Sequence, residues 1–144
     1  MDKCNNVFFM SGGTIDDNVA SILLQTMNIS MNQIQISNSD TIYRFGMQNQ
    51  WKIQKYLNKK INISLSKARA FNPFPWQYRN DSYLIYTDSI INSIPDNNLW
   101  PKYPDGERAL YNYLENALTN KIKITILVTA PLTPLTNVLK KIQC

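Results

Sequence analysis

The stretch Val7-Phe8-Phe9-Met10-Ser11-Gly12-Gly13-Thr14-Ile15-Asp16-Asp17 determines how the rest of this 144-residue chain is interpreted. Its apolar run, Val7 to Met10, is typical of a buried strand, and the two glycines that follow indicate a tight loop. We expect a helix next, because Asp16 and Asp17 lie where carboxylates favour the positive end of a helix dipole. The stretch therefore predicts a strand, a loop and a helix, with two carboxylates just beyond the end of the strand.

Strands and helices continue to alternate along the sequence. We predict further strands at 33–37, 61–64 and 123–128, and helices at 43–57, at about 107–120 and toward Ile142. The strand at 123–128 is apolar enough to be buried on both faces. Two prolines, Pro73 and Pro75, exclude regular helix or central strand, so we expect 66–79 to be an ordered loop. The order predicts an α/β fold: a mainly parallel sheet with helices on both faces and ligands at the carboxyl ends of the strands.

Composition excludes several classes of protein. The length suits a single domain spanning 1–144, and the 44% of hydrophobic residues is enough for a core. The net charge of +5 comes from scattered basic residues, so we do not expect nucleic-acid binding. No run of about 18 apolar residues and no signal-peptide pattern occurs. Cys4 and Cys144 form neither a metal motif nor a disulfide framework. We expect a soluble, intracellular, cytoplasmic protein without a membrane span.

Three segments carry residues suited to chemistry, and each follows or adjoins a predicted strand. Asp16 and Asp17 offer oxygen ligands for a hard cation and acceptors for ribose hydroxyls, although helix capping alone also explains carboxylates at this position. Ala70 to Arg79 combines aromatic and amide side chains that suit a base and its sugar, or simply pack a loop onto the core. The third segment, Ile126 to Asn137, by itself indicates only a strand, a turn and a helix.

Taken in order, the three segments resemble the nucleoside hydrolases. That family has an N-terminal Asp-x-Asp-x-x-x-Asp-Asp loop and a later strand that ends in Gly-Pro-Leu-Thr-Asn. Asn72-Pro73-Phe74-Pro75, followed by Tyr78-Arg79, is similar to the Asn-Pro-Phe-Pro-x-x-Trp-Arg segment of the purine-preferring branch. The matches run from Val7 to Asn137, so the sequence resembles the N-terminal part of a domain about twice as long. The resemblance implies a truncated Rossmann-like domain whose family reaction is the calcium-assisted hydrolysis of the N-glycosidic bond of ribonucleosides.

The resemblance also assigns roles to individual residues. Asp17 and the backbone carbonyl of Thr129 match calcium ligands, with Leu132 as the alternative to Thr129 because Pro-Leu-Thr occurs twice. Four residues match substrate contacts: Asp16 on the ribose diol, Asp40 and Asn72 on the nucleoside, and Tyr78, in place of a tryptophan, on the purine. The aspartate that binds calcium and takes the proton from water falls on Gly12, and another motif aspartate falls on Met10. The family's C-terminal half, with a second calcium aspartate and an active-site histidine, has no counterpart.

These departures lead to three alternative functions. The first is a nucleoside hydrolase-like protein that is inactive in isolation, with no catalytic residue assigned because Gly12 can neither bind calcium nor accept a proton. The second is a noncatalytic structural or accessory subunit of a larger assembly. Under both, we expect a homo- or hetero-oligomer that covers an exposed sheet edge and an apolar face. The third is an asparaginase-like amidohydrolase with Thr14 as nucleophile, since Phe9 to Ile15 is similar to the Thr-Gly-Gly-Thr-Ile loop of L-asparaginases; their Gly-Thr-Asp-Thr segment does not occur.

Overall fold

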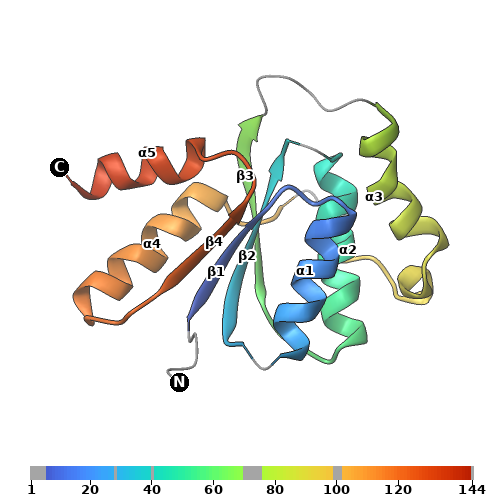
Figure 1. Ribbon diagram of the computed structural model, residues 1–144, viewed down its shortest axis with the longest axis horizontal. Helices are drawn as coiled ribbons and strands as arrows, with labels where there is room; N and C mark the ends of the chain where they lie inside the picture. The colour runs from blue at the N-terminus through green and yellow to red at the C-terminus, as the bar shows by residue number, and fades with distance from the viewer. Residues whose placement is uncertain (1–5, 28, 40, 70–75, 99–101, 144) are drawn as a thin grey trace.

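The computed structural model describes residues 6–27, 29–39, 41–69, 76–98 and 102–143, except for the side chains of 76–78. In these parts of the protein, four parallel strands form one sheet in the order β3-β2-β1-β4 (Figure 1). The predicted α/β fold with a parallel sheet is confirmed. The strands are β1 (Val7–Ser11), β2 (Met31–Asn38), β3 (Asn62–Arg69) and β4 (Thr125–Thr129).

Helices cover both faces of the sheet, as the alternation of elements predicts. Two helices, α1 and α2, pack on one face, and α4 and α5 pack on the other. The helix α3 and the short 3-10 helix η1 lie against α2. Within the described ranges, no helix has the length and apolar character needed to cross a membrane. The helices are α1 (Ile15–Thr26), α2 (Tyr43–Tyr56), α3 (Trp76–Asp88), η1 (Ile90–Ser93), α4 (Gly106–Thr119) and α5 (Thr133–Ile142).

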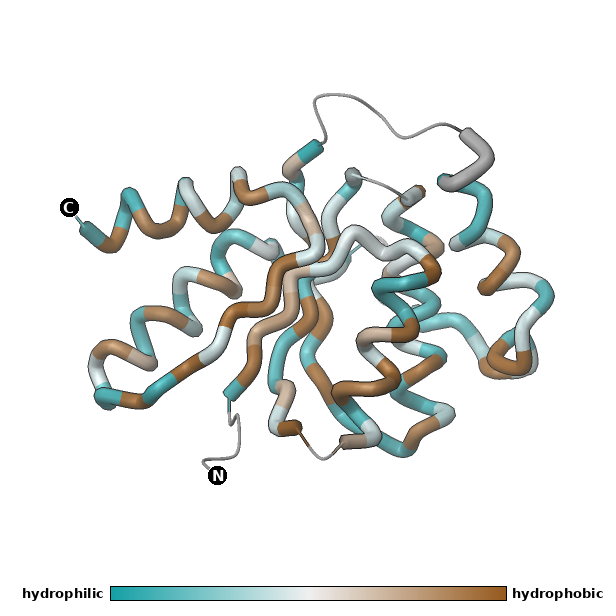
Figure 2. Tube along the Cα trace, in the orientation of Figure 1, coloured by the Kyte–Doolittle hydropathy of each residue, from teal (hydrophilic) through white to brown (hydrophobic). Residues whose placement is uncertain are grey.

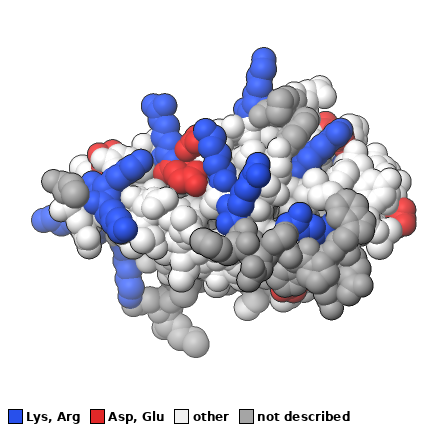
Figure 3. Space-filling model, turned by 90° about the horizontal axis from the view of Figure 1, so that it is seen from above, with Lys and Arg blue, Asp and Glu red and all other residues white. Residues whose placement is uncertain are grey.

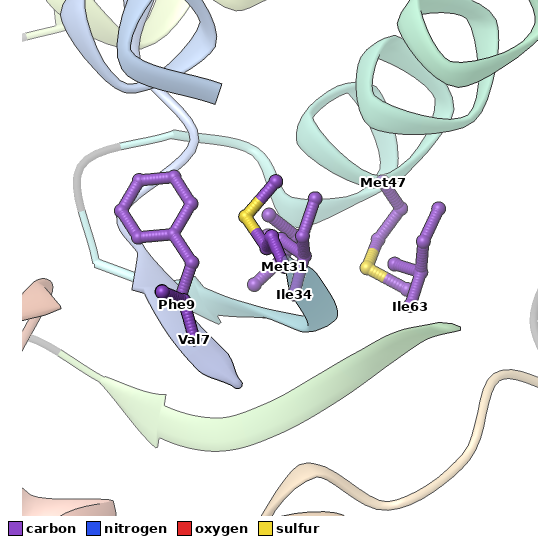
Figure 4. Packing of buried hydrophobic residues seen from close by; sticks show 7 residues of the cluster. Val7, Phe9, Met31, Ile34, Met47 and Ile63 are labelled. Atoms are coloured by element: carbon purple, nitrogen blue, oxygen red, sulfur yellow. The ribbon is translucent and has the colours of Figure 1, made fainter. Parts of the chain in front are cut away.

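β1 contributes to the hydrophobic layers on both faces, because successive side chains of a strand point to opposite sides. Val7 and Phe9 face α1 and α2, whereas Phe8 and Met10 face α4 and α5. Figure 2 shows hydrophobic residues along β1 and β4. Full burial of each such aliphatic or aromatic side chain contributes about 1.5–3 kcal/mol to the stability of the folded protein. The first layer (Figure 4) contains Val7, Phe9, Met31, Ile34, Ile36, Met47 and Ile63, and the second contains Phe8, Met10, Leu110, Leu114 and Val138.

The prediction of a loop at 66–79 is wrong for both ends of this segment, which belong to a strand and a helix. β3 continues to Arg69, and α3 already begins at Trp76. A proline restricts its own backbone and that of the residue before it, so Pro73 and Pro75 constrain a shorter segment than the predicted loop. The prolines themselves lie outside the described residues.

The predicted burial of the last strand on both faces is also wrong. β4 is an edge strand that, among the described strands, pairs with β1 alone. Its end residues, Thr125 and Thr129, are exposed, and the three residues between them are only partly buried. Ile126 and Val128 pack against the α4 and α5 side, which explains the apolar sequence without a second neighbouring strand.

Gly106 allows the start of α4 to lie directly against β3. A Cβ atom at this position would lie 2.8 Å from the backbone nitrogen of Ser66 and 2.9 Å from the carbonyl carbon of Leu65. Two hydrogen bonds hold the start of α4 close to β3. The Leu65 N–H donates to Pro104 O at 2.9 Å, and Asp105 caps α4 by accepting from the Arg108 N–H at 2.8 Å. Backbone atoms cannot move aside as a flexible side chain can, so this contact requires glycine.

We expect Gly106→Ala to lower the free energy of unfolding by about 1–3 kcal/mol, the usual range for overpacking. Urea denaturation measures the change. Gly46→Ala is the matched control, because the two atoms nearest its Cβ would be side-chain atoms, Thr41 Cγ2 at 3.2 Å and Ile36 Cγ2 at 3.3 Å, and the backbone Cα of Gly13 would lie at an ordinary contact distance of 3.6 Å. Alanine also favours the helix at position 46. Equal stability of Gly106→Ala and the parent protein would show that α4 does not press on β3.

Candidate functional site

The carboxyl ends of β1, β2 and β4 lie side by side at one end of the sheet, and the loop after β1 begins there. Ser11, the last residue of β1, lies beside Ile36 on β2 and Thr129 on β4. Gly13 adopts a φ of +83°, and a Cβ atom there would lie 2.5 Å from Thr41 Cγ2, so the loop requires glycine at this position. The Gly13 N–H donates to Ser11 Oγ at 3.0 Å. The loop is therefore tightly bonded where the candidate carboxylates begin.

Asp17 is buried, with 2% of its surface exposed, and both of its carboxylate oxygens accept hydrogen bonds. Oδ2 accepts from the Thr14 N–H and lies within hydrogen-bond distance of the Thr14 hydroxyl, each at 3.0 Å. Oδ1 accepts from the Thr129 hydroxyl. The Thr14 contacts form a capping box at the start of α1, and the Thr129 contact joins α1 to the end of β4. Asp17 is thus a helix cap and a link between two elements.

Burial raises the pKa of Asp17 above the usual range of an aspartate. Hydrogen bonds from Thr129 and Thr14 oppose this rise, and the negative charge of Asp16 adds to it. The structure therefore gives Asp17 a clear structural role in a buried environment.

The six predicted site residues are only partly described. Asp17 and Thr129 lie together through the hydrogen bond between their side chains. Asp16 is exposed beside them, and its carboxylate accepts from the Thr14 hydroxyl, the group that the asparaginase-like alternative would use as nucleophile. Asp40 and Asn72 lie outside the described residues, and Tyr78 lies in the first turn of α3 with its side chain outside them. The roles assigned to all six remain predictions.

The described residues do not form a calcium site by themselves. Among them, no group of three or more acidic, histidine or cysteine side chains is close enough together to hold a metal ion. Calcium takes about 6–8 oxygen ligands, and the oxygens of Asp17 already accept from Thr14 and Thr129. Gly12, buried in the loop, adds no side-chain oxygen.

Several polar side chains that the sequence did not single out lie at the same end of the sheet. The hydroxyls of Ser37 and Ser39, both buried at the end of β2, are 3.0 Å apart. Ser82 of α3 donates to Gly13 O at 2.6 Å, and Arg79 donates to Ser39 O at 3.4 Å. Lys and Arg side chains project over much of this end of the molecule (Figure 3). The position of Ser37 and Ser39 at the end of a predicted strand could have identified them as candidate site residues. The contacts from Arg79 and Ser82 could not be predicted, because they come from a helix that the sequence pattern did not predict.

We expect Asp17 to make the protein less stable as the pH rises. Because its pKa is raised by folding, the folded protein holds this proton more tightly than the unfolded protein does, so the free energy of unfolding falls as the pH rises from about 4 through the raised pKa. Urea denaturation between about pH 4 and pH 7 should show a decline that is smaller in Asp17→Asn. Asp88→Asn, at an exposed position of α3, is the control. An identical pH dependence in all three proteins would contradict the assignment.

No protein-family model matches the sequence, and no curated protein matches it significantly. The likeness to the nucleoside hydrolases therefore rests on the three sequence segments and on a fold of the expected class.

Proposed function

We propose that this protein is a nucleoside hydrolase-like domain that does not hydrolyse nucleosides by itself. The order of the three segments supports the likeness, as does the position of Asp16, Asp17 and Thr129 at the edge of a parallel sheet where ligands bind in such folds. One observation carries the loss of activity. Asp17 is fully engaged in capping α1 and in binding Thr129, while Gly12 stands where the resemblance requires a carboxylate.

The proposed inactivity follows from the chemistry that the described residues lack. Attack of water on the anomeric carbon requires a group that accepts a proton, and such a group contributes about 10²- to 10⁴-fold to a rate. Glycine at position 12 has no such group. Of the two adjacent carboxylates, Asp17 is buried and Asp16 is exposed at the loop. In this exposed position Asp16 suits contact with hydroxyl groups better than activation of a shielded water.

We expect the purified protein to release no measurable free base from inosine, adenosine or guanosine in the presence of calcium. Gly12→Asp should not restore turnover, because one added carboxylate replaces neither the other metal ligands nor an acid for the leaving base. Chromatographic detection of hypoxanthine, adenine and guanine is the measurement. Calcium-dependent release of base by the parent protein would disprove the proposal.

The same substitution tests whether the loop keeps the geometry of a metal site. We expect titration calorimetry to detect calcium binding by Gly12→Asp but not by the parent protein, because an additional carboxylate supplies the charge that the described site lacks. Gly12→Asn is the matched control, with the same size and no charge. If none of the three proteins binds calcium, the loop has become purely structural and the likeness to a metal site is lost.

A second candidate function, that of a noncatalytic accessory subunit, is favoured by the surface of α1. This helix buries polar Asn18, Ser21 and Gln25 and packs Ala20 and Leu24 on the core, whereas its other apolar side chains are exposed. These lie on one side of the helix, by their spacing of three and four residues. An apolar helix face that stays exposed is typical of a surface that a partner protein covers. The exposed residues are Ile15, Val19, Ile22, Leu23 and Met27, with exposures of 47%, 49%, 37%, 53% and 67%.

For the subunit function, we expect the natural protein, purified under native conditions, to have a mass above the 16.7 kDa of the monomer. Val19→Glu should reduce that mass, because a charge in the apolar surface of α1 opposes its burial. Light scattering coupled to size-exclusion chromatography measures it. Leu118→Glu, at a position of α4 with 64% exposure, is the control. A natural protein with the mass of a monomer would contradict the subunit function.

A further inference from the structure

A cleft of about 1160 Å³ runs along the outer edge of β3, and none of the predicted site residues lines it. Its floor is the segment from Ile61 to Ser64. One wall comes from α2, with Trp51 and Lys55, and the other from the first turns of α4, with Arg108. The cleft therefore lies between the two helical layers, at the edge of the sheet opposite to β4.

Part of the edge of β3 in this cleft has no strand partner among the described residues. Within the described residues, β3 pairs with β2 on one side and on the other meets only the bridge between Leu65 and Asp105. The Leu65 N–H donates outward to Pro104 O at 2.9 Å. Because alternate residues of a strand direct their backbone groups to the same side, the N–H and C=O of Ile63 also point outward, into the cleft. The contact at Leu65 shows that this edge accepts an extended segment.

The charges around the open edge are unbalanced. Four basic residues line the cleft, namely Lys55, Lys59, Lys60 and Arg108, but only one acidic residue, Asp105. Asp105 already pairs with Lys67 at 3.8 Å. Edge-to-edge pairing of two copies of a protein with net charge +5 would place these like charges together, which disfavours self-association here. Complementarity instead favours an acidic partner.

The walls of the cleft also offer apolar surface for side chains. Trp51 is held in place by its Nε1–H, which donates to Pro95 O at 3.2 Å, and the Lys55 ammonium lies 4.4 Å from the centre of its ring. Tyr113 is held from the other side by Phe8, with ring centroids 5.2 Å apart. Fixed aromatic groups beside an open strand edge provide sites for side chains of an added strand.

We propose that this cleft binds an extended, acidic segment of a partner protein as an added strand next to β3. The backbone of the segment bonds to Ile63, and its carboxylates pair with the surrounding lysines and Arg108. Apolar side chains on its two faces contact Trp51 on one side of the sheet and Tyr113 on the other. This proposal is independent of the nucleoside hydrolase likeness, because it uses none of those residues.

Selection from a library of random peptides of about ten residues, long enough for one strand, tests the proposal with the intact protein. We expect the selected peptides to be enriched in Asp and Glu together with apolar residues. A fluorescent consensus peptide should bind about tenfold or more weakly to Lys59→Glu/Lys60→Glu, and more weakly as salt increases. Lys140→Glu/Lys141→Glu is the matched control: these lysines are also adjacent and exposed, but they lie on α5 outside the cleft, and binding should be unchanged.

A second measurement separates strand addition from simple charge attraction. The consensus peptide with N-methyl groups on alternate residues keeps its carboxylates but loses backbone donors on one side, so one of the two alternating patterns should abolish binding. Failure to enrich acidic peptides, equal binding to the Lys59/Lys60 variant, or unchanged binding with both methylation patterns would overturn the proposal. Binding of a short oligothymidylate in place of any peptide would also overturn it and indicate a nucleic-acid site.

Discussion

β1 lies between two hydrophobic layers, and the rest of the structure depends on keeping both of its faces covered. A parallel strand in the middle of a sheet has no face that can be left to water, so helices are needed on each side. Phe8 and Phe9, next to each other in the sequence, are both completely buried but belong to opposite layers. Two of the candidate site residues are positioned from this strand: the loop to Asp17 continues it, and β4, with Thr129, pairs with it.

The helices on the β1–β2 side are joined by polar contacts as well as by apolar packing. The Ser21 hydroxyl donates to Gln50 Oε1 at 2.7 Å, Gln50 Nε2 donates to Asn18 Oδ1 at 2.8 Å, and Gln25 Nε2 donates to Ser21 Oγ at 2.9 Å. Buried polar groups need partners, so this series of bonds fixes α1 against α2 in one rotation about its axis. That rotation has a consequence for the surface. With Asn18, Ser21 and Gln25 turned inward, α1 presents several of its apolar residues outward.

The sequence predicted an element well where its hydrophobic pattern alone determines it. It predicted less where the position of an element depends on which neighbouring elements it contacts. Val7 to Met10 could be identified as a buried strand because its apolar run was bounded by glycines, and the convergence of Asp17 with Thr129 follows from the rule that parallel strands end at one edge. The edge position of β4 could not be read from its apolar residues, because hydropathy reports what side chains contact and not whether another strand lies alongside. Nor could the sequence show that Thr14 and Thr129 donate hydrogen bonds to the carboxylate of Asp17, because Thr129 is 112 residues away from Asp17 in the sequence.

The two edges of the sheet differ in chemistry, and this difference bears on how the protein meets other molecules. Open edges invite other strands, and proteins usually limit this with charged side chains. At β3 the lysines stand beside the open segment, where they repel a second basic copy but attract an acidic strand, so the same charges that protect the edge also select its partner. At β4 the strand residues are Thr125, Ile126, Leu127, Val128 and Thr129, without a charge, and most of the exposed residues of α1 are apolar. Burial of apolar area there would favour a permanent contact, whereas the charged edge at β3 suits a contact that salt and sequence regulate.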